Sequence, residues 1–202
     1  MDNKSLKFSP EYENPIDNLI INNGKLLYPI YRKLNFTPNH LTFISMVTGI
    51  SSVYLFYKKN FIVSAVLFFT SYCFDVFDGN YARTYDMITV FGDYFDHIKD
   101  LIVNISLIIV FLCYSKITHN IILITITLFL FVTMFLHLGC QEVFVKKYKP
   151  KKYQSEYLSV FGNICTKFGI EDYSNQLKWF GCGTYIMWIT FIILIHHFIK
   201  LD

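Results

Sequence analysis

Long apolar runs, separated by short polar connections, make up most of the chain. Residues 39–57 contain no Asp, Glu, Lys or Arg, and residues 121–138 are mostly Ile, Leu and Phe. A third run of this kind, residues 179–199, lies near the C-terminus. A helix needs about 20 apolar residues to cross a bilayer core of about 30 Å. The hydropathy pattern therefore predicts three membrane-spanning helices at these positions.

Two further apolar runs reach the length of a span only if each includes an acidic end. Residues 61–74 stop at Asp75, and residues 101–115 follow Asp100. Carboxylates inside transmembrane helices are costly and usually mark a functional site. The expected fold class is all-α, a polytopic transmembrane helix bundle of five to six spans. The sixth span depends on residues 140–178, part of which could instead form a short interfacial or re-entrant helix.

The N-terminal part of the chain is amphipathic. Residues 13–35 place Ile and Leu at spacings of three and four among charged and amide side chains. This pattern indicates one or two helical pieces lying on a membrane surface, and an ordinary soluble helix pair is the alternative. We therefore expect residues 1–38 to form a cytosolic or interfacial segment and residues 39–202 to form the membrane domain.

The distribution of Lys and Arg predicts a cytosolic N-terminus, because cytosolic loops are enriched in these residues. The active site would then lie near the cytosolic face, and five spans would put the C-terminus outside. The inside regions would hold Lys25, Arg32, Lys33, Arg83, Lys146, Lys147, Lys149, Lys151 and Lys152. The outside regions would hold Lys58, Lys59, Lys116 and Lys200.

Composition supports a membrane protein and excludes other classes. Hydrophobic residues make up 53% of the chain and charged residues 16%, against about 25% charge in soluble domains. This argues against a disordered protein. The net charge is only +3, and the sequence has no dense basic stripe of the kind that binds nucleic acid, which argues against a nucleic-acid-binding protein. The five cysteines are odd in number and show no CxxC spacing, so we expect reduced thiols.

The acidic residues near the middle of the chain form two helical pairs. Asp75 and Asp78 are three residues apart, and Asp96 and Asp100 are four apart, so each pair shares a helix face. Asp93 could join the second face. In two antiparallel helices both pairs would lie at a similar depth, roughly 9 Å inside the cytosolic edge of the core. The sequence therefore predicts one cluster of four carboxylates.

Carboxylates at that depth repel one another unless they take up protons or bind cations. A site made of oxygen atoms suits Mg²⁺, Ca²⁺ or Mn²⁺, and four carboxylates can hold two such ions. Gly79 and Ala82 leave room beside the acids for a phosphate group, and Arg83 can pair with a phosphate. Gly92 permits close packing of the second helix. These features predict a site where metal and phosphate meet.

The spacing of these residues resembles a family signature. Asp75-x-x-Asp78-Gly79-x-x-Ala82-Arg83, followed after eight residues by Gly92-x-x-x-Asp96-x-x-x-Asp100, is similar to the full signature of the CDP-alcohol phosphotransferase family. Residues 38–42, Pro-Asn-His-Leu-Thr, also resemble the sequence that precedes that family's first span. The resemblance implies transfer of a substituted phosphate from a CDP-alcohol to a second alcohol, with release of CMP, in phospholipid biosynthesis.

The resemblance also implies a role for each matching residue. Asp75, Asp78 and Asp96 would hold two divalent ions, Mg²⁺ or Mn²⁺. Asp100 would contribute to the metal cluster and act as the general base, and both Asp96 and Asp100 would be catalytic. The CDP pocket would be lined by Gly79, Ala82, Arg83, Asn39 and Thr42. The expected partners are the CDP-alcohol donor, the acceptor alcohol, membrane lipids and a second copy of the chain, with no nucleic acid.

The sequence is compatible with two pairs of donor and acceptor substrates. CDP-diacylglycerol with a polar alcohol is slightly favoured by the small size of the chain. CDP-choline or CDP-ethanolamine with diacylglycerol is the alternative, because the pair Asp96-His97 resembles that branch. A divalent-cation transporter would also use buried acids, but it would not need Gly79, Ala82 and Arg83 at their spacing. An inactive scaffold of the same family is a further alternative.

Overall fold

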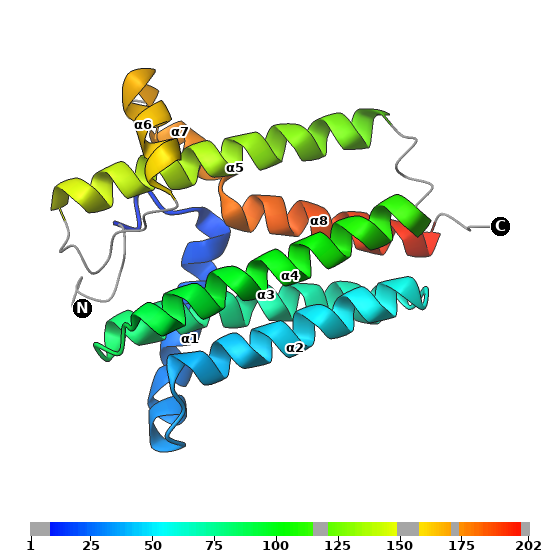
Figure 1. Cartoon of the computed structure of the whole chain (residues 1–202), viewed down its shortest axis with the longest axis horizontal. Coiled ribbons are helices and arrows are strands. Elements are labelled where there is room, and N and C mark those ends of the chain that lie inside the picture. The colour runs from blue at the N-terminus through cyan, green and yellow to red at the C-terminus, as the bar shows by residue number, and fades with distance from the viewer. Residues whose placement is uncertain (1–8, 115–120, 149–157, 171–173, 199–202) are drawn as a thin grey trace.

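The computed structural model describes residues 9–114, 121–148, 158–170 and 174–198, and its regular elements in these ranges are helices (Figure 1). They are α1 (Pro15–Lys33), α2 (Pro38–Tyr57), α3 (Phe61–Thr84), α4 (Val90–Tyr114), α5 (Ile121–Tyr148), α6 (Ser159–Lys167), α7 (Ser174–Leu177), the 3₁₀ turn η4 (Lys178–Phe180) and α8 (Cys182–Phe198).

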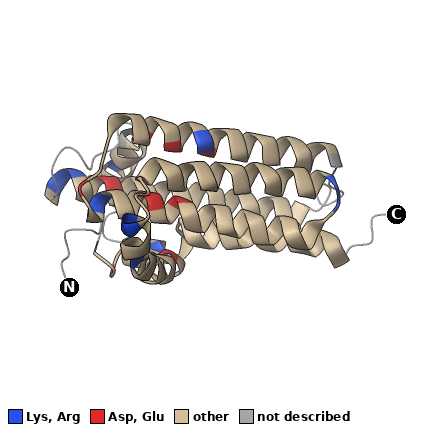
Figure 2. Ribbon diagram, turned by 90° about the horizontal axis from the view of Figure 1, so that it is seen from below, with Lys and Arg blue, Asp and Glu red and all other residues tan. Residues whose placement is uncertain are grey.

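Five of these helices run along the long axis of the molecule. Figure 1 shows α2, α3, α4, α5 and α8 in this direction, while α1 crosses them near one end. Figure 2 shows that Lys, Arg, Asp and Glu gather mostly at the end where α1 crosses. The predicted all-α bundle with a separate amphipathic N-terminal helix is therefore confirmed.

Within the described residues, four segments are long and apolar enough to cross a membrane: α2, α3, α5 and residues Asn175–Phe198, which include α8. The remaining predicted span, third in chain order, corresponds to α4, whose first turns carry Asp96 and Asp100. Its 25 residues would extend about 37 Å, long enough to cross. Because α4 packs against α2 and lies along the same axis as α2 and α3 (Figure 1), we treat it as spanning. In place of a sixth span, the structure has the nine-residue α6, too short to cross.

Local contacts explain where α1 begins and why Gly24 does not divide it into two pieces. The Asn14 side chain caps it by accepting a hydrogen bond from the Ile16 N–H at 3.0 Å, and Pro15 is the first helical residue. Gly24 does not interrupt the helix. A Cβ at this position would lie 2.5 Å from the Phe77 ring, so the glycine lets α1 lie closely on α3.

Small polar residues hold α2 against α3. The Ser45 and Ser71 hydroxyls donate to each other's backbone carbonyls at 2.8 and 2.7 Å. Ser52 and Ser64 repeat this exchange at 2.7 and 2.8 Å. Small residues at helix contacts in membranes let the backbones approach closely, and the exchanged bonds fix the register. Since Asp75 and Asp78 follow Ser71 by one and two turns, this register also places the acidic residues of α3.

Two apolar clusters form the core. One joins α2, α3, α4 and α8 and includes Phe56, Leu107 and Ile193. The other joins α1, α2 and α3 and includes Tyr28 and Tyr81. The acidic residues of α3 belong to the same helical turns as the second cluster. The apolar contact with α1 therefore fixes the part of α3 that carries the acids.

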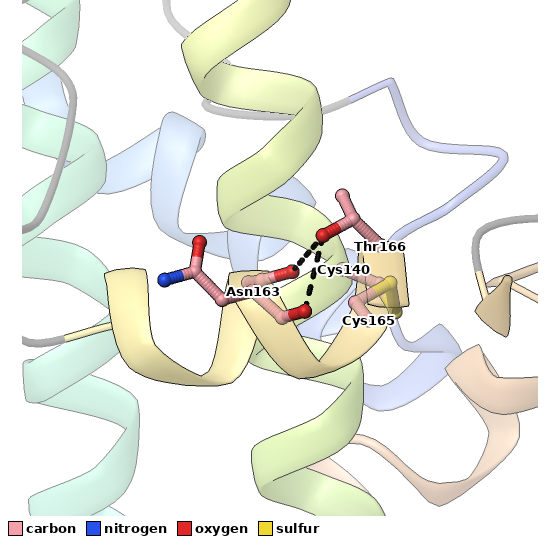
Figure 3. Close-up of a disulfide and its surroundings, with 5 residues drawn as sticks. Cys140, Asn163, Cys165 and Thr166 are labelled. Carbon is pink, nitrogen blue, oxygen red and sulfur yellow. Dashed lines mark hydrogen bonds between the residues drawn. A yellow bond between two sulfur atoms is a disulfide. The ribbon is translucent and has the colours of Figure 1, made fainter. Parts of the chain in front are cut away.

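The expectation of reduced thiols is wrong for two cysteines. Cys140 on α5 and Cys165 on α6 form a disulfide that closes a separation of 25 residues (Figure 3). Gly139 permits the contact, because a Cβ there would lie 2.6 Å from the Phe161 backbone. The remaining cysteines, Cys73, Cys113 and Cys182, are free as expected.

Several of the lysines used to predict the orientation lie outside the described residues. They are Lys116, Lys149, Lys151, Lys152 and Lys200. The sidedness of the bundle stays a prediction.

Candidate functional site

The two acidic pairs meet between α3 and α4. Ligand oxygens of Asp75, Asp78 and Asp96 lie within 4.8 Å of one another. Asp78 is buried at 5% exposure, whereas the side chains of Asp75 and Asp96 are 24% and 30% exposed. One side of the cluster is therefore buried in the bundle and the other can be reached from outside it. Asp93 lies elsewhere: its carboxylate is 57% exposed and faces His97 at 3.7 Å.

The sequence reasoning missed a lysine in this cluster. The Lys99 ammonium forms an ion pair with Asp75 and lies 2.8 Å from Asp100 Oδ1 and 3.1 Å from Asp96 Oδ1. Its side chain is only 2% exposed. Lys99 follows Asp96 by three residues on α4, and this helical spacing was the signal that could have placed it on the acidic face.

The α2 helix contributes hydroxyl groups to the same cluster. Thr42 Oγ1 donates a hydrogen bond of 2.6 Å to Asp78 Oδ2, and both side chains are buried. Ser45 Oγ lies 3.4 Å from the Lys99 ammonium. Thr42, expected in the CDP pocket, thus contacts an aspartate in the structure. This contact orients Asp78.

The donor set fits a hard divalent cation. Its atoms are carboxylate oxygens, which Mg²⁺ and Mn²⁺ prefer. Asp96 Oδ1 is buried and makes no hydrogen bond in the part of the chain that the structure describes, since its contact with Lys99 lacks hydrogen-bond geometry. A buried carboxylate oxygen without a donor is costly, and a cation held together with Asp75 and Asp78 would satisfy it.

The predicted phosphate-binding residues lie next to the cluster on α3. Arg83 folds back along its own helix, so that a Cβ on Gly79 would lie 3.3 Å from Nη1 and 3.4 Å from Nη2. The glycine therefore leaves room for the guanidinium. Ala82, which precedes Arg83 in the chain, is half-buried. Asn39 of α2 approaches the start of α4, since its Oδ1 would lie 3.0 Å from a Cβ on Gly92.

A second polar contact that the sequence reasoning missed ties α1 to the bundle. The Tyr72 hydroxyl donates to Asp17 Oδ1 at 2.5 Å, and the Gly183 N–H donates to Oδ2 at 3.4 Å. Asn14 Nδ2 donates to Thr184 Oγ1 at 2.9 Å. Burial, with a smaller contribution from the nearby Glu13 charge, raises the pKa of Asp17 to about 7. These contacts hold α1 against α3 and α8 close to the acidic cluster.

The model of one protein family, CDP-alcohol phosphatidyltransferase, matches residues 35–196, which include all four aspartates of the cluster. The chain belongs to this family. Over 102 residues it is also 28% identical to the archaetidylinositol phosphate synthase of Pyrococcus horikoshii. That match covers half of this chain and half of the relative's length. No solved structure matches the chain.

Membership of the CDP-alcohol phosphatidyltransferase family confirms the resemblance seen in the sequence. The reaction of the family, transfer from a CDP-alcohol donor to an alcohol acceptor in phospholipid synthesis, is therefore the candidate activity of this chain, which spans about half the length of the relative. Members of the family use a divalent metal, and the aspartate cluster supplies an all-oxygen donor set for one. The apolar helices agree with an integral membrane protein.

Proposed function

We propose that the chain transfers a phosphatidyl-type group from CDP-diacylglycerol to a polar alcohol and releases CMP. The observation that supports this best is the cluster of Asp75, Asp78 and Asp96, whose ligand oxygens, from α3 and α4, lie within 4.8 Å of one another. A lipid donor suits a site at one end of a transmembrane bundle, because the lipid stays in the bilayer while a polar acceptor approaches from water.

The name of the relative from Pyrococcus horikoshii favours this choice of substrates. An archaetidylinositol phosphate synthase makes a lipid that carries an inositol phosphate. By analogy, the acceptor here is a polar alcohol such as inositol phosphate, inositol, serine or glycerol phosphate. The second candidate is transfer of phosphocholine or phosphoethanolamine to diacylglycerol, which the Asp96-His97 pair favours.

The metal would be Mg²⁺ or Mn²⁺, held by Asp75, Asp78 and Asp96. When bound, it supplies positive charge that neutralises the pyrophosphate of the donor as CMP leaves. Thr42 keeps the Asp78 carboxylate in its orientation through the 2.6 Å hydrogen bond. The two ions expected from the sequence fit only if the Lys99 ammonium leaves its place beside Asp75, Asp96 and Asp100.

Two other residues would act on the substrates. The Arg83 guanidinium, lying beside Gly79, would pair with a phosphate of the donor. Asp100 would accept the proton of the acceptor hydroxyl, a contribution typically of 10²–10⁴-fold. Its side chain is 48% exposed, so an acceptor can reach it. Lys99 holds Asp100 Oδ1, and we assign the proton transfer to Oδ2.

The test is CMP release by the purified protein in detergent with Mg²⁺. One arm supplies CDP-diacylglycerol with each polar alcohol in turn, and the other supplies CDP-choline or CDP-ethanolamine with diacylglycerol. We expect CMP only in the first arm and only with one class of acceptor. Release in the second arm alone would overturn the substrate assignment. Binding of CDP with Mg²⁺ separates an enzyme from a cation transporter, which would bind the metal without the nucleotide.

We further propose that the N-terminus and the active site face the cytosol, as the distribution of Lys and Arg predicts, and that residues 1–38 and 39–202 act as interfacial segment and membrane domain. Assembly as a homodimer is a further option that the family resemblance raises.

A further inference from the structure

The exposed face of α4 carries one polar side chain in the middle of the span. Between Leu101 and Leu112 the exposed residues are Leu or Ile, and Asn104 is the exception. Leu101 and Ile105 are 60% and 47% exposed, so this face meets the bilayer. We propose that the Asn104 amide binds an ester carbonyl of the diacylglycerol portion of the lipid substrate. The inference rests on the proposed function, and it applies to either candidate pair of substrates, since both include a diacylglycerol.

Asn104 lies one helical turn beyond Asp100, on the side of α4 that carries the acidic cluster. Its Nδ2 donates a hydrogen bond of 2.8 Å to the Asp100 backbone carbonyl. Four residues of α-helix advance about 6 Å, and they do so away from the charged end of the bundle (Figure 2). The packing of α4 against α2 uses other residues, Lys99 beside Ser45 and Val103 against Gly49. Asn104 is therefore a polar group on the bilayer side of the cluster.

The hydrogen bond to Asp100 satisfies only part of the Asn104 amide. A side-chain amide has two N–H donors and an oxygen acceptor. Within the residues that the structure describes, the second N–H and the oxygen of Asn104 make no hydrogen bond. Lipid chains offer no partner, and an unpaired amide in hydrocarbon is costly. Thr125, exposed on α5, avoids this cost because its single O–H donates to the Ile121 carbonyl at 2.7 Å.

A diacylglycerol supplies the partner that Asn104 needs. Its ester carbonyls lie a few bonds from the oxygen that carries the phosphate, or from the free hydroxyl when diacylglycerol is the acceptor. With that oxygen at the aspartates, the ester groups lie on the bilayer side, where Asn104 is. The second N–H can then donate to an ester carbonyl, while the acyl chains follow Leu101, Ile105 and Ile108. The amide would thus distinguish ester lipids from lipids without carbonyls.

A second copy of the chain is the other partner that an exposed amide could have, because Asn side chains can join membrane helices. The place of Asn104 argues against this. A helix packed over Asn104 would also cover Asp100, one turn away. The Asp100 side chain is 48% exposed, and the acceptor alcohol has to reach it. A lipid substrate is the occupant that agrees with access to Asp100.

The experiment measures the binding of CDP-diacylglycerol, of its dialkyl ether analogue and of CDP, each with Mn²⁺, in detergent. The chains are the wild type, Asn104→Leu, and Thr125→Val as the matched control. For Asn104→Leu we expect the dissociation constant of CDP-diacylglycerol to rise roughly fivefold, as the loss of one hydrogen bond predicts. Its binding of the ether analogue and of CDP should stay within about twofold of the wild type, because neither ligand has an ester carbonyl. Thr125→Val should match the wild type with all three.

Three results would overturn the proposal: unchanged affinity of Asn104→Leu for CDP-diacylglycerol, an equal loss for the ester and the ether, or a change in oligomeric state. CDP binding reports whether Asn104→Leu is folded. If it is not, Asn104→Ala takes its place with the same expectations. If CMP release identifies diacylglycerol as the acceptor, the comparison uses the KM for diacylglycerol against that for its dialkyl analogue.

The proposed function and this inference fail in different ways. If the wild type neither binds CDP nor releases CMP from either donor, the proposed function fails. If the wild type releases CMP but Asn104→Leu handles ester and ether lipids as the wild type does, only the role of Asn104 is refuted.

Discussion

Replacing Thr42 with valine removes the hydrogen bond to Asp78 from the metal site, together with a longer contact of 3.2 Å from the same hydroxyl to the Pro38 carbonyl of its own helix. Valine has nearly the shape of threonine but no hydroxyl, so Asp78 Oδ2 loses the donor that lies 2.6 Å away. Both side chains are buried, Thr42 at 2% and Asp78 at 5% exposure, so water does not readily replace the donor. A hydrogen bond to a charged group contributes about 1.5–3 kcal/mol. We therefore expect Thr42→Val to weaken metal binding by roughly 10–100-fold.

The assay is a Mn²⁺ titration of binding and of CMP release, run for each variant. Thr42→Ser keeps the hydroxyl and should stay within about threefold of the wild type. Thr48→Val is the matched control on the same helix, because the Thr48 hydroxyl donates only to its own helix backbone at 2.8 Å. If Thr42→Val binds Mn²⁺ as tightly as the control does, Thr42 does not orient a metal ligand and the reasoning is refuted.

Other predictions concern stability and the phosphate pocket. Because the pKa of Asp17 is raised to about 7, the folded protein binds this proton more tightly than the unfolded chain does. The free energy of unfolding therefore contains a contribution that is complete below about pH 4 and is lost as the pH rises through 7. This contribution amounts to roughly 4 kcal/mol at most. Asp17→Asn should flatten this dependence in thermal unfolding across pH. Cys140→Ser opens a loop of 25 residues and should cost about 3 kcal/mol, whereas Cys113→Ser should leave the melting temperature unchanged. Gly79→Ala should press a methyl group against the Arg83 guanidinium and raise the KM for the CDP-alcohol about tenfold with little loss of stability, as steady-state kinetics would show.

The spans and the acidic face could be predicted because both depend on local periodicity. Asp75 and Asp78 share a face in any α-helix, and so do Asp96 and Asp100. The apolar runs that became α2 and α5 have the length that a bilayer requires. The spacing could not predict the burial of each carboxylate, because burial depends on how α3 packs against α1 and α2.

The features that were missed depend on contacts between distant parts of the chain. Lys99 could be placed on the face of Asp96, but its burial depends on the register of α4 against α2, where Ser45 lies. The Cys140–Cys165 disulfide requires α6 to fold back on α5, and no spacing rule predicts that contact. In the sequence Asp17 is an ordinary acidic residue in the first turn of a helix. Its burial could not be predicted, because it depends on hydrogen bonds donated by Tyr72 and Gly183 from distant helices.

The central claim is that the aspartates between α3 and α4 carry out a metal-dependent transfer from a CDP-alcohol. The most direct measurement compares CMP release by Asp96→Asn with that by Asp93→Asn. Both substitutions remove a carboxylate from the N-terminal part of α4, but only Asp96 lies in the cluster, whereas Asp93 faces His97 at 3.7 Å. We expect Asp96→Asn to lose at least 100-fold in rate while Asp93→Asn stays within about threefold of the wild type. Equal activity in the two variants would contradict the account.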